Sequence, residues 1–363
     1  MNPKSAIFSQ YLSDHEMEKI TSDEKFIRRV LEFEIALAKE QSYLDIIPKK
    51  ASEEIGRVLA ELTISPEELR QGTLLNGVPI LPLLELVKEK LSTESKTYLH
   101  FGATSQDAMD TAMVLMLREA LGVINERLTT LEDNLSQLRE KYGDTPCMAR
   151  TRGQLAVPIS FGDKIDAWLG PLKRHEKRLT TISKGALKIQ LGGAAGNRAA
   201  YHEKGETLSD ALASALKLSG GSSWHAQRDS LCELTNWLAI ISSILGKMGA
   251  DILVLAQSEI NEVTENAEGG GKSSAMPHKN NPILSEALVA LAKLNAGLQS
   301  QMLLCLIHTN ERDATAWILE WSCVPQMLIN TATSLGHAIA ISKKVKVNTD
   351  NMRLNVERFK NQG

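Results

Sequence analysis

Aromatic residues are scarce in this chain, at 4% of 363 residues, and alternating runs of β-branched residues are hard to find. Strands are rich in such residues, so the sequence gives little support for a large sheet. Hydrophobic residues make up 43% and charged residues 23%, an ordinary balance for a soluble globular protein. We therefore expect a mainly helical protein, with one large domain or two to three smaller ones.

An excess of one charge sign is also lacking. Lys and Arg number 41 against 44 Asp and Glu, a net charge of -3, so no global field favours nucleic acid or an anionic membrane. The most apolar stretch, around 237–256, is interrupted by Lys247 and Asp251, and the N-terminus lacks the pattern of a signal peptide. We expect a cytoplasmic protein that binds neither nucleic acid nor membrane.

Cysteine is too sparse for a disulfide framework or a CxxC metal site, because Cys147, Cys232, Cys305 and Cys323 lie far apart. No cluster of His, Cys and carboxylates has metal-ligand spacing. The stretch Leu191-Gly-Gly-Ala-Ala-Gly196 is only superficially like a dinucleotide loop, since no predicted strand precedes it. We expect no metal and no organic cofactor.

Long apolar stripes with alternating steps of three and four residues predict helices packed lengthwise. One stripe runs from Leu117 to Leu138, a second from Leu234 to Leu255, and a third from Leu284 to Cys305 with the polar Asn295 inside it, where register could be fixed. Helices of roughly 30 residues would be about 45 Å long, which favours a long bundle. A bundle core explains these stripes better than a cofactor site does. The second stripe continues onto Glu259 and Glu262, at either a solvated bundle end or a site.

Shorter helical segments precede the stripes. Ser65, Pro66 and Glu68 have the spacing of a helix N-cap, a first helical residue and a capping box. We predict an N-terminal helical domain at 1–104, a central long-helix bundle at 105–342, and the start of a C-terminal helical domain at 343–363, apparently truncated.

The most unusual segment is 268–282, Glu-Gly-Gly-Gly-Lys-Ser-Ser-Ala-Met-Pro-His-Lys-Asn-Asn-Pro. It is either a flexible connection between helices or a mobile loop that carries hydroxyls onto a substrate. Asn281 and Pro282 predict the N-cap and first residue of a helix, whose positive end would suit a carboxylate.

Two further segments gather polar groups. His100 precedes a Gly turn, and Thr104 and Ser105 stand where a long helix begins, as an N-cap or as a carboxylate cradle. The segment 150–158, Arg-Thr-Arg-Gly-Gln-Leu-Ala-Val-Pro, collects donors without acids just ahead of another helix.

In this order, the segments resemble the fumarase/aspartase superfamily, and the likeness covers essentially the whole chain. Its loop signature, G-S-S-x-M-P-x-K-x-N-P, corresponds to residues 272–282, and HFGATSQDAMDT at 100–111 matches its first region. Within the superfamily the chain is most similar to bacterial 3-carboxy-cis,cis-muconate cycloisomerases, with adenylosuccinate lyases next. That likeness rests on GATSQDAMDT, on WHAQRD at 224–229, and on Glu311-Arg312 followed by Trp317 and Glu320-Trp321.

The resemblance implies an all-α long-helix bundle and an enzyme that makes or breaks a bond beta to a carboxylate. It implies that Ser273 is the catalytic base at the carbon next to a carboxylate, and that His100 is a second acid/base group. It implies a set of substrate-binding residues: Thr104, Ser105, Arg150, Thr151, Gln154, Ser274, Met276, Lys279 and Asn281.

Departures from the family pattern bear on the reaction. The lyases usually have His where this chain has Arg152, and Leu155 replaces a His often seen in the cycloisomerases. Cleavage that expels a nitrogen benefits from a positioned acid, whereas lactone opening expels a carboxylate whose conjugate acid has a pKa of about 4. The missing acid therefore favours a cycloisomerase that forms 4-carboxymuconolactone.

Two alternatives stay open: an adenylosuccinate-type lyase and a non-catalytic structural homologue. The expected partner is a small polycarboxylate. The resembled family forms homotetramers with sites shared between subunits, and long helices would keep His100 and Ser273 of one chain far apart. We therefore expect a homotetramer with composite sites.

Overall fold

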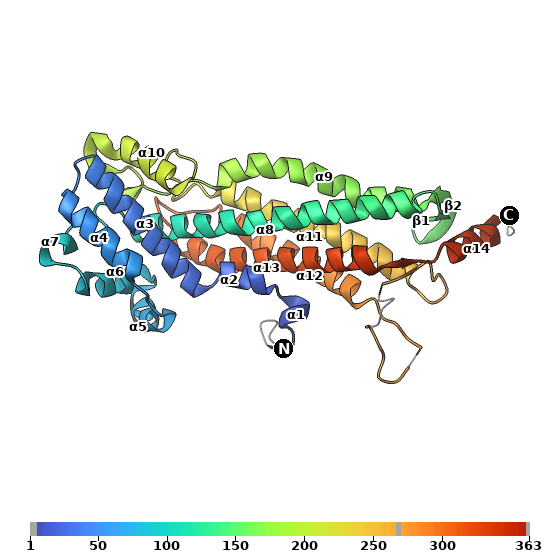
Figure 1. Ribbon diagram of the computed structural model, residues 1–363. Coiled ribbons are helices and arrows are strands. Elements are labelled where there is room, and N and C mark those ends of the chain that lie inside the picture. Colours follow the sequence, from blue (N-terminus) through green and yellow to red (C-terminus); the bar gives the residue numbers. More distant parts are fainter. Residues whose placement is uncertain (1–5, 266–269, 277, 361–363) are drawn as a thin grey trace.

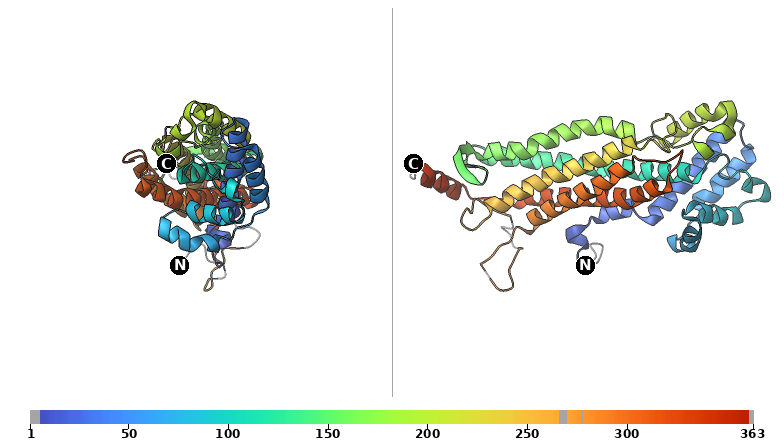
Figure 2. Two further views of the ribbon diagram at one scale, coloured as in Figure 1. Left: turned by 90° about the vertical axis from the view of Figure 1, so that its left-hand side faces the viewer. Right: turned by 180° about the vertical axis from the view of Figure 1, so that it is seen from behind.

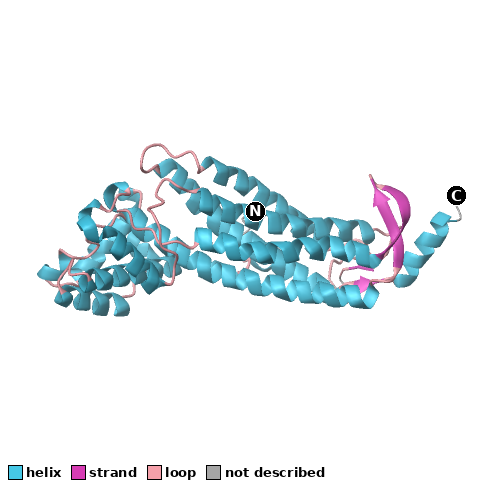
Figure 3. Cartoon of the chain, turned by 90° about the horizontal axis from the view of Figure 1, so that it is seen from above, coloured by secondary structure: helices cyan, strands magenta, loops and turns pink. Residues whose placement is uncertain are grey.

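Five long helices run side by side along most of the molecule (Figures 1 and 2). They are α8 (Ser105–Tyr142), α9 (Phe161–Ala186), α11 (Asp229–Leu255), α12 (Ile283–Leu304) and α13 (Ala314–Lys344). The computed structural model describes residues 6–265, 270–276 and 278–360. The predicted all-α long-helix bundle is confirmed, and Figure 3 shows how little of the chain is strand.

The predicted apolar stripes form the bundle core. All seven stripe positions from Leu117 to Leu138 on α8 and all seven from Leu234 to Leu255 on α11 are buried. Asn295 of α12 is buried as well, and its side-chain amide donates to Ser242 Oγ of α11 at 2.7 Å and Thr331 Oγ1 of α13 at 3.0 Å. The polar residue of the third stripe is therefore a hydrogen-bonded junction of three helices.

Shorter helices pack on the bundle, most of them around the first turns of α8. They are α1 (Ser9–Leu12), α2 (His15–Ile20), α3 (Asp23–Tyr43), α4 (Lys49–Glu61), α5 (Pro66–Asn76), α6 (Ile80–Glu89), α7 (Thr93–Lys96) and α10 (Gly205–Leu216). The capping box predicted at Ser65 is present at the start of α5. A second apolar core joins α3, α4 and α6 to the start of α8 and to α10, so this end of the molecule takes in sequence beyond residue 104. The domain division at 104 stays a prediction.

A β-hairpin stands at the opposite end of α8, where the sequence indicated only a run of donors before a helix. Strand β1 (Pro146–Thr151) pairs antiparallel with β2 (Gln154–Ser160). Arg152 and Gly153, both with positive φ (54° and 83°), form the two-residue turn, which is the geometry that matches the twist of paired strands. The sequence did not predict this hairpin, because its strands carry few strand signals and a single glycine marks its turn.

The same end holds short elements that close the bundle. Strand β3 (Val263–Thr264) pairs with β4 (Lys346–Val347), and helix α14 (Thr349–Lys360) follows (Figure 1). Helix α11 is long and apolar enough to cross a membrane by length and composition alone. Its apolar character is explained by its packing against α9, α12 and α13 within the bundle.

Candidate functional site

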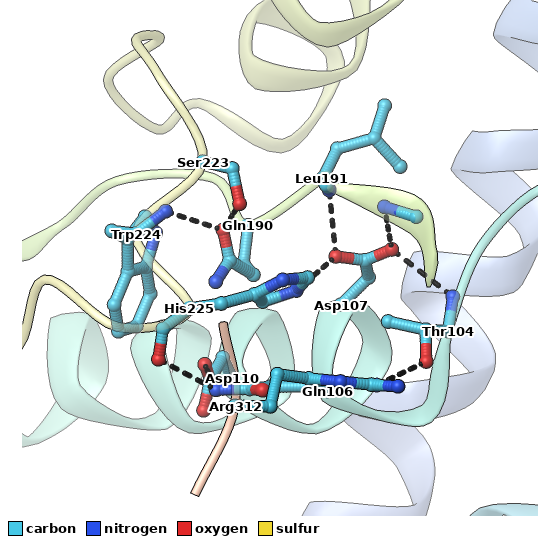
Figure 4. Close-up of polar contacts among 12 residues, drawn as sticks. Thr104, Gln106, Asp107, Asp110, Gln190, Leu191, Ser223, Trp224, His225 and Arg312 are labelled. Atoms are coloured by element: carbon cyan, nitrogen blue, oxygen red, sulfur yellow. Dashed lines mark hydrogen bonds and ion pairs between the residues drawn. The ribbon is translucent and has the colours of Figure 1, made fainter. Parts of the chain in front are cut away.

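The first candidate group is built on the N-terminus of α8, and Figure 4 shows its contacts. The long helix begins here, as the sequence predicted, and of the two hydroxyl residues Thr104 is the N-cap and Ser105 the first helical residue. The hydroxyl oxygen of Thr104 accepts a hydrogen bond from Arg312 at 2.6 Å. A hydroxyl, a guanidinium and a helix N-terminus therefore meet in one place, which suits a carboxylate.

Asp107 holds this N-terminus in position. Its fully buried carboxylate accepts backbone N–H groups of Thr104 at 3.0 Å, Gly192 at 2.7 Å and Gly193 at 2.9 Å. It also contacts His225 Nε2 at 2.8 Å. The glycine pair that superficially matched a dinucleotide loop therefore binds a carboxylate of the protein itself.

We call the group formed by Thr104, Ser105 and Arg312 at the start of α8 the cradle. A buried ion cluster lies next to it. Arg228, the N-cap residue of α11, donates to Asp110 of α8 at 2.7 Å and to Glu320 of α13. The indole N–H of Trp317 donates to Asp110 at 2.9 Å. Burial lowers the pKa of Arg228, but Asp110 and Glu320 outweigh it, so the net pKa is raised and the guanidinium stays charged. The cluster fastens three helices together beneath Thr104.

His100 stands at the edge of the same region in a left-handed conformation, with φ of 59°. Its Nδ1 lies 2.5 Å from Glu34 Oε1 of α3. Burial lowers the pKa of His100, but Glu34 raises it more, so the net pKa is raised. Glu34 therefore stabilises the charged form of this imidazole.

The second candidate group lies on the hairpin. Thr151 and Gln154 are exposed and pair with each other across the Arg152–Gly153 turn. Arg150 is directed back into the bundle end, with its Nη2 3.7 Å from Glu262 Oε1. Glu262 is fully buried and also accepts from Asn355 at 3.0 Å, so it is paired within the protein, whereas Glu259 is exposed.

The third group is the loop before α12. The hydroxyl oxygen of Ser273 accepts backbone N–H groups of Ala275 at 3.3 Å and Met276 at 3.2 Å. Ser274, Met276 and Lys279 are exposed. A bridge between Lys272 and Asn280 closes the loop at its base.

The predicted cap of α12 is wrong by one residue. Pro282 is the N-cap and Ile283 the first helical residue, so Asn281 lies outside the helix. The carboxylate of Glu265 accepts the N–H groups of Leu284 at 2.9 Å and Ser285 at 2.8 Å. This helix end therefore already binds an internal carboxylate.

One chain does not bring the three groups together (Figure 1). The 38 residues of α8 separate Thr104 from the hairpin by about 57 Å. The 22 residues of α12 separate the Ser273 loop from the connection that carries Arg312 by about 33 Å. Ser273 and His100 of one chain therefore cannot act on one small molecule.

Sequence reasoning assigned no role to Asp107, His225 or Arg312. Asp107 follows the N-cap Thr104 by three residues, which is the spacing of a capping-box acid, and this signal could have singled it out. His225 and Arg312 carried no such local signal, since their partners lie 118 and 208 residues away. Within the described residues, no three His, Cys, Asp or Glu side chains are grouped as metal ligands.

A sequence profile of the Lyase family matches residues 13–294. The chain belongs to the Lyase family. The resemblance to the fumarase/aspartase superfamily is thereby confirmed. The fold of this Lyase-family chain is similar to the crystal structure of 3-carboxy-cis,cis-muconate lactonizing enzyme from Pseudomonas putida, with a TM-score of 0.92 and 36% identity, over 97% of this chain and 80% of that one.

Curated relatives of the Lyase-family chain have more than one activity in their names. A 3-carboxy-cis,cis-muconate cycloisomerase of Pseudomonas putida is 36% identical over 97% of this chain and 84% of its own. An N-acetyl-S-(2-succino)cysteine lyase of Dickeya dadantii is 33% identical over 94% of this chain and 76% of its own.

Proposed function

We propose that this chain is a 3-carboxy-cis,cis-muconate cycloisomerase that forms 4-carboxymuconolactone in the cytoplasm, without a metal or an organic cofactor. The observation that carries the proposal is the pair of backbone N–H groups directed at Ser273 Oγ, in a loop with the family signature. Relatives and a solved structure with this activity in their names support the choice of reaction.

The proposed reaction requires the transfer of one proton to a carbon atom of the substrate and the binding of the substrate's carboxylates. A carboxylate oxygen of the substrate bonds to one carbon of a double bond, and the π electrons move onto the neighbouring carbon and its carboxylate. The hydroxyl of Ser273 gives that carbon its proton and becomes an alkoxide, which takes up a proton from solvent before the next turnover. In lactone opening the alkoxide takes the proton from the carbon. A serine alkoxide forms at neutral pH only if its negative charge is stabilised, and the two N–H groups directed at Ser273 Oγ supply hydrogen bonds for this. We assign the positive charge of Lys279, in the same loop, to the same role.

The remaining predicted residues bind substrate carboxylates. Thr104 and Ser105 offer hydroxyls and a helix N-terminus, with Arg312 beside them. The other groups proposed for this role are Arg150, Thr151, Gln154, Ser274, Met276, Lys279 and Asn281. His100, paired with Glu34, is proposed as the acid/base imidazole.

We further propose that the enzyme is a homotetramer with sites shared between subunits. The outward face of the bundle supports this, because apolar side chains continue there: Ile240 and Val254 on α11 are 36% and 39% exposed, and Leu294 and Leu304 on α12 are 55% and 57% exposed. The residues of each pair are 14 and 10 residues apart, spacings that return to the same half of a helix, and exposed apolar residues on one side suit packing against another chain.

A lyase that splits a succinyl compound, as in the Dickeya relative's name or in adenylosuccinate cleavage, is the second candidate. Two parallel assays distinguish the cycloisomerase from the lyase. Ultraviolet absorbance follows loss of 3-carboxymuconate, and a parallel assay follows fumarate released from adenylosuccinate and from N-acetyl-S-(2-succino)cysteine. Conversion of 3-carboxymuconate alone, with lactone as product, supports the proposal, whereas release of fumarate without lactone formation contradicts it.

A further inference from the structure

The connection between α12 and α13, residues 305–313, holds an imidazole with no internal role. Both ring nitrogens of His308 are buried and neither has a hydrogen-bond partner. Across the described ranges, no other side chain leaves two buried polar atoms unpartnered. A buried polar atom without a hydrogen bond destabilises the folded protein, so native proteins rarely keep two on one side chain without a use.

His308 lies beside the cradle at the start of α8. Four residues further along the same connection, Arg312 donates to Thr104 Oγ1 at 2.6 Å. The charges that act on His308 are those of Arg228 and Asp110 in the buried cluster and of Asp313 on its own connection. His308 therefore lies close enough to the buried cluster beneath Thr104 to feel its charges, on the same connection that brings Arg312 to Thr104.

Its chemistry fits a carboxylate. Burial, followed by Arg228, lowers the pKa of His308, so the ring is neutral at pH 7. A neutral imidazole has one N–H donor and one acceptor nitrogen. The other imidazoles of this region are engaged, His225 with Asp107 and His100 with Glu34.

We propose that His308 is a substrate-binding residue whose N–H donates to a substrate carboxylate held by Thr104 and Arg312. The ring can rotate out to the ligand at little cost because no internal hydrogen bond holds its nitrogens in place. This inference rests on the proposed function for the class of ligand, a polycarboxylate.

Replacing His308 by Phe tests the proposal, because it keeps a ring and removes both nitrogens. We expect an unchanged or higher melting temperature, since two unsatisfied polar atoms disappear. We expect the KM for 3-carboxymuconate to rise about 10- to 100-fold, the value of one hydrogen bond to a charged group, with a smaller change in kcat. Unfolding of both His308→Phe and His308→Leu would mean that the nitrogens are bonded inside the protein, and it overturns the proposal.

Rescue and control variants sharpen the result. His308→Gln and His308→Asn place an amide near Nε2 and Nδ1 respectively, and one of them should bring the KM back to within a few-fold of wild type. His15→Phe, at a side chain that is 81% exposed, should leave the KM unchanged. A wild-type KM in His308→Phe contradicts the inference and leaves the proposed function intact.

A binding measurement separates the two proposals. Tricarballylate, a stable tricarboxylate, should raise the melting temperature of the wild type and raise that of His308→Phe much less. If the wild type binds tricarballylate in this His308-dependent way but does not convert 3-carboxymuconate, the proposed function fails and this inference stands. If tricarballylate stabilises both proteins equally, or neither, the inference fails.

Discussion

Asp107 and His225 form a buried pair across 118 residues of sequence, with Asp107 Oδ1 2.8 Å from His225 Nε2. Asp107 is fully buried and His225 is 3% exposed. Because the Asp107 carboxylate accepts the backbone N–H groups of Thr104, Gly192 and Gly193, it ties the start of α8 to the glycine pair. The position of Thr104 therefore depends on a carboxylate that no substrate needs to touch.

Asp107→Asn should lower the free energy of unfolding by about 3 kcal/mol, because an amide presents N–H groups to the three backbone donors and leaves His225 without an anion. Urea unfolding measures this. Asp350→Asn is the matched control, since the Asp350 side chain is 91% exposed and pairs only at the surface. Equal stability of the two variants would contradict the supporting role of Asp107.

Ser273→Ala should leave the fold intact and lower turnover of 3-carboxymuconate at least about 100-fold, the low end of general acid–base contributions. Among the residues that the structure describes, the hydrogen bonds of the Ser273 hydroxyl stay within its loop, so its loss should not change the melting temperature. The exposed Ser258 provides the control variant, Ser258→Ala, which should turn over normally. Nearly full turnover in Ser273→Ala would remove Ser273 from the mechanism.

Glu132 on α8 makes the stability depend on pH. Burial, and then the charge of Glu176, raise its pKa from 4.5 to about 7. A folded-state pKa above the unfolded one stabilises the protein at low pH, and this contribution is lost as the pH rises through 7. Glu132→Gln should therefore be more stable than the wild type at pH 8, by about 1–2 kcal/mol after allowance for solvent screening.

Below pH 4.5 the advantage of Glu132→Gln should vanish, because the wild-type carboxyl is protonated in both states. Thermal unfolding at pH 4, 6 and 8 measures the trend. Glu140→Gln, two turns along the same helix at an exposed position, should show no such trend. A constant difference between Glu132→Gln and wild type at every pH would argue against the raised pKa.

The long helices were predictable because a single period governs them. The apolar residues from Leu234 to Leu255 follow one another at alternating steps of three and four residues, and all of them are buried in the bundle. The hairpin was not predictable in the same way, since Arg152 and Gly153 specify a turn with two residues and the short strands carry few β-branched side chains. The predicted start of α12 was wrong by one residue. Glu265, 19 residues before Leu284, accepts the hydrogen bond at the helix end that Asn281 was expected to accept.

The residues of the candidate site also differ in whether a local sequence pattern could predict them. The segments around Thr104, Gln154 and Ser273 were found from motifs that are local in sequence. His225 and Arg312 were missed because their roles come from contacts with Asp107 and Thr104, which only the folded chain creates. Their assignment, like that of the motif residues, stays a proposal until variants are measured.

The separation of the three groups makes a test of assembly possible. Ser273 precedes α12 at one end of the bundle, whereas His100 lies beside α3 at the other, so a working site would take these groups from different subunits. Ser273→Ala and His100→Ala should each be inactive and folded. When equal amounts are dissociated, mixed and reassembled at random, a site receives an intact Ser273 with a chance of about one half and an intact His100 with the same chance. About a quarter of wild-type turnover should therefore return.

Each variant carried through the same procedure alone is the control, and subunit exchange is verified by mass spectrometry of the mixed oligomers. If exchange occurs and no activity returns, both groups belong to one chain's site, and the geometry described here would have to change by tens of ångströms on assembly.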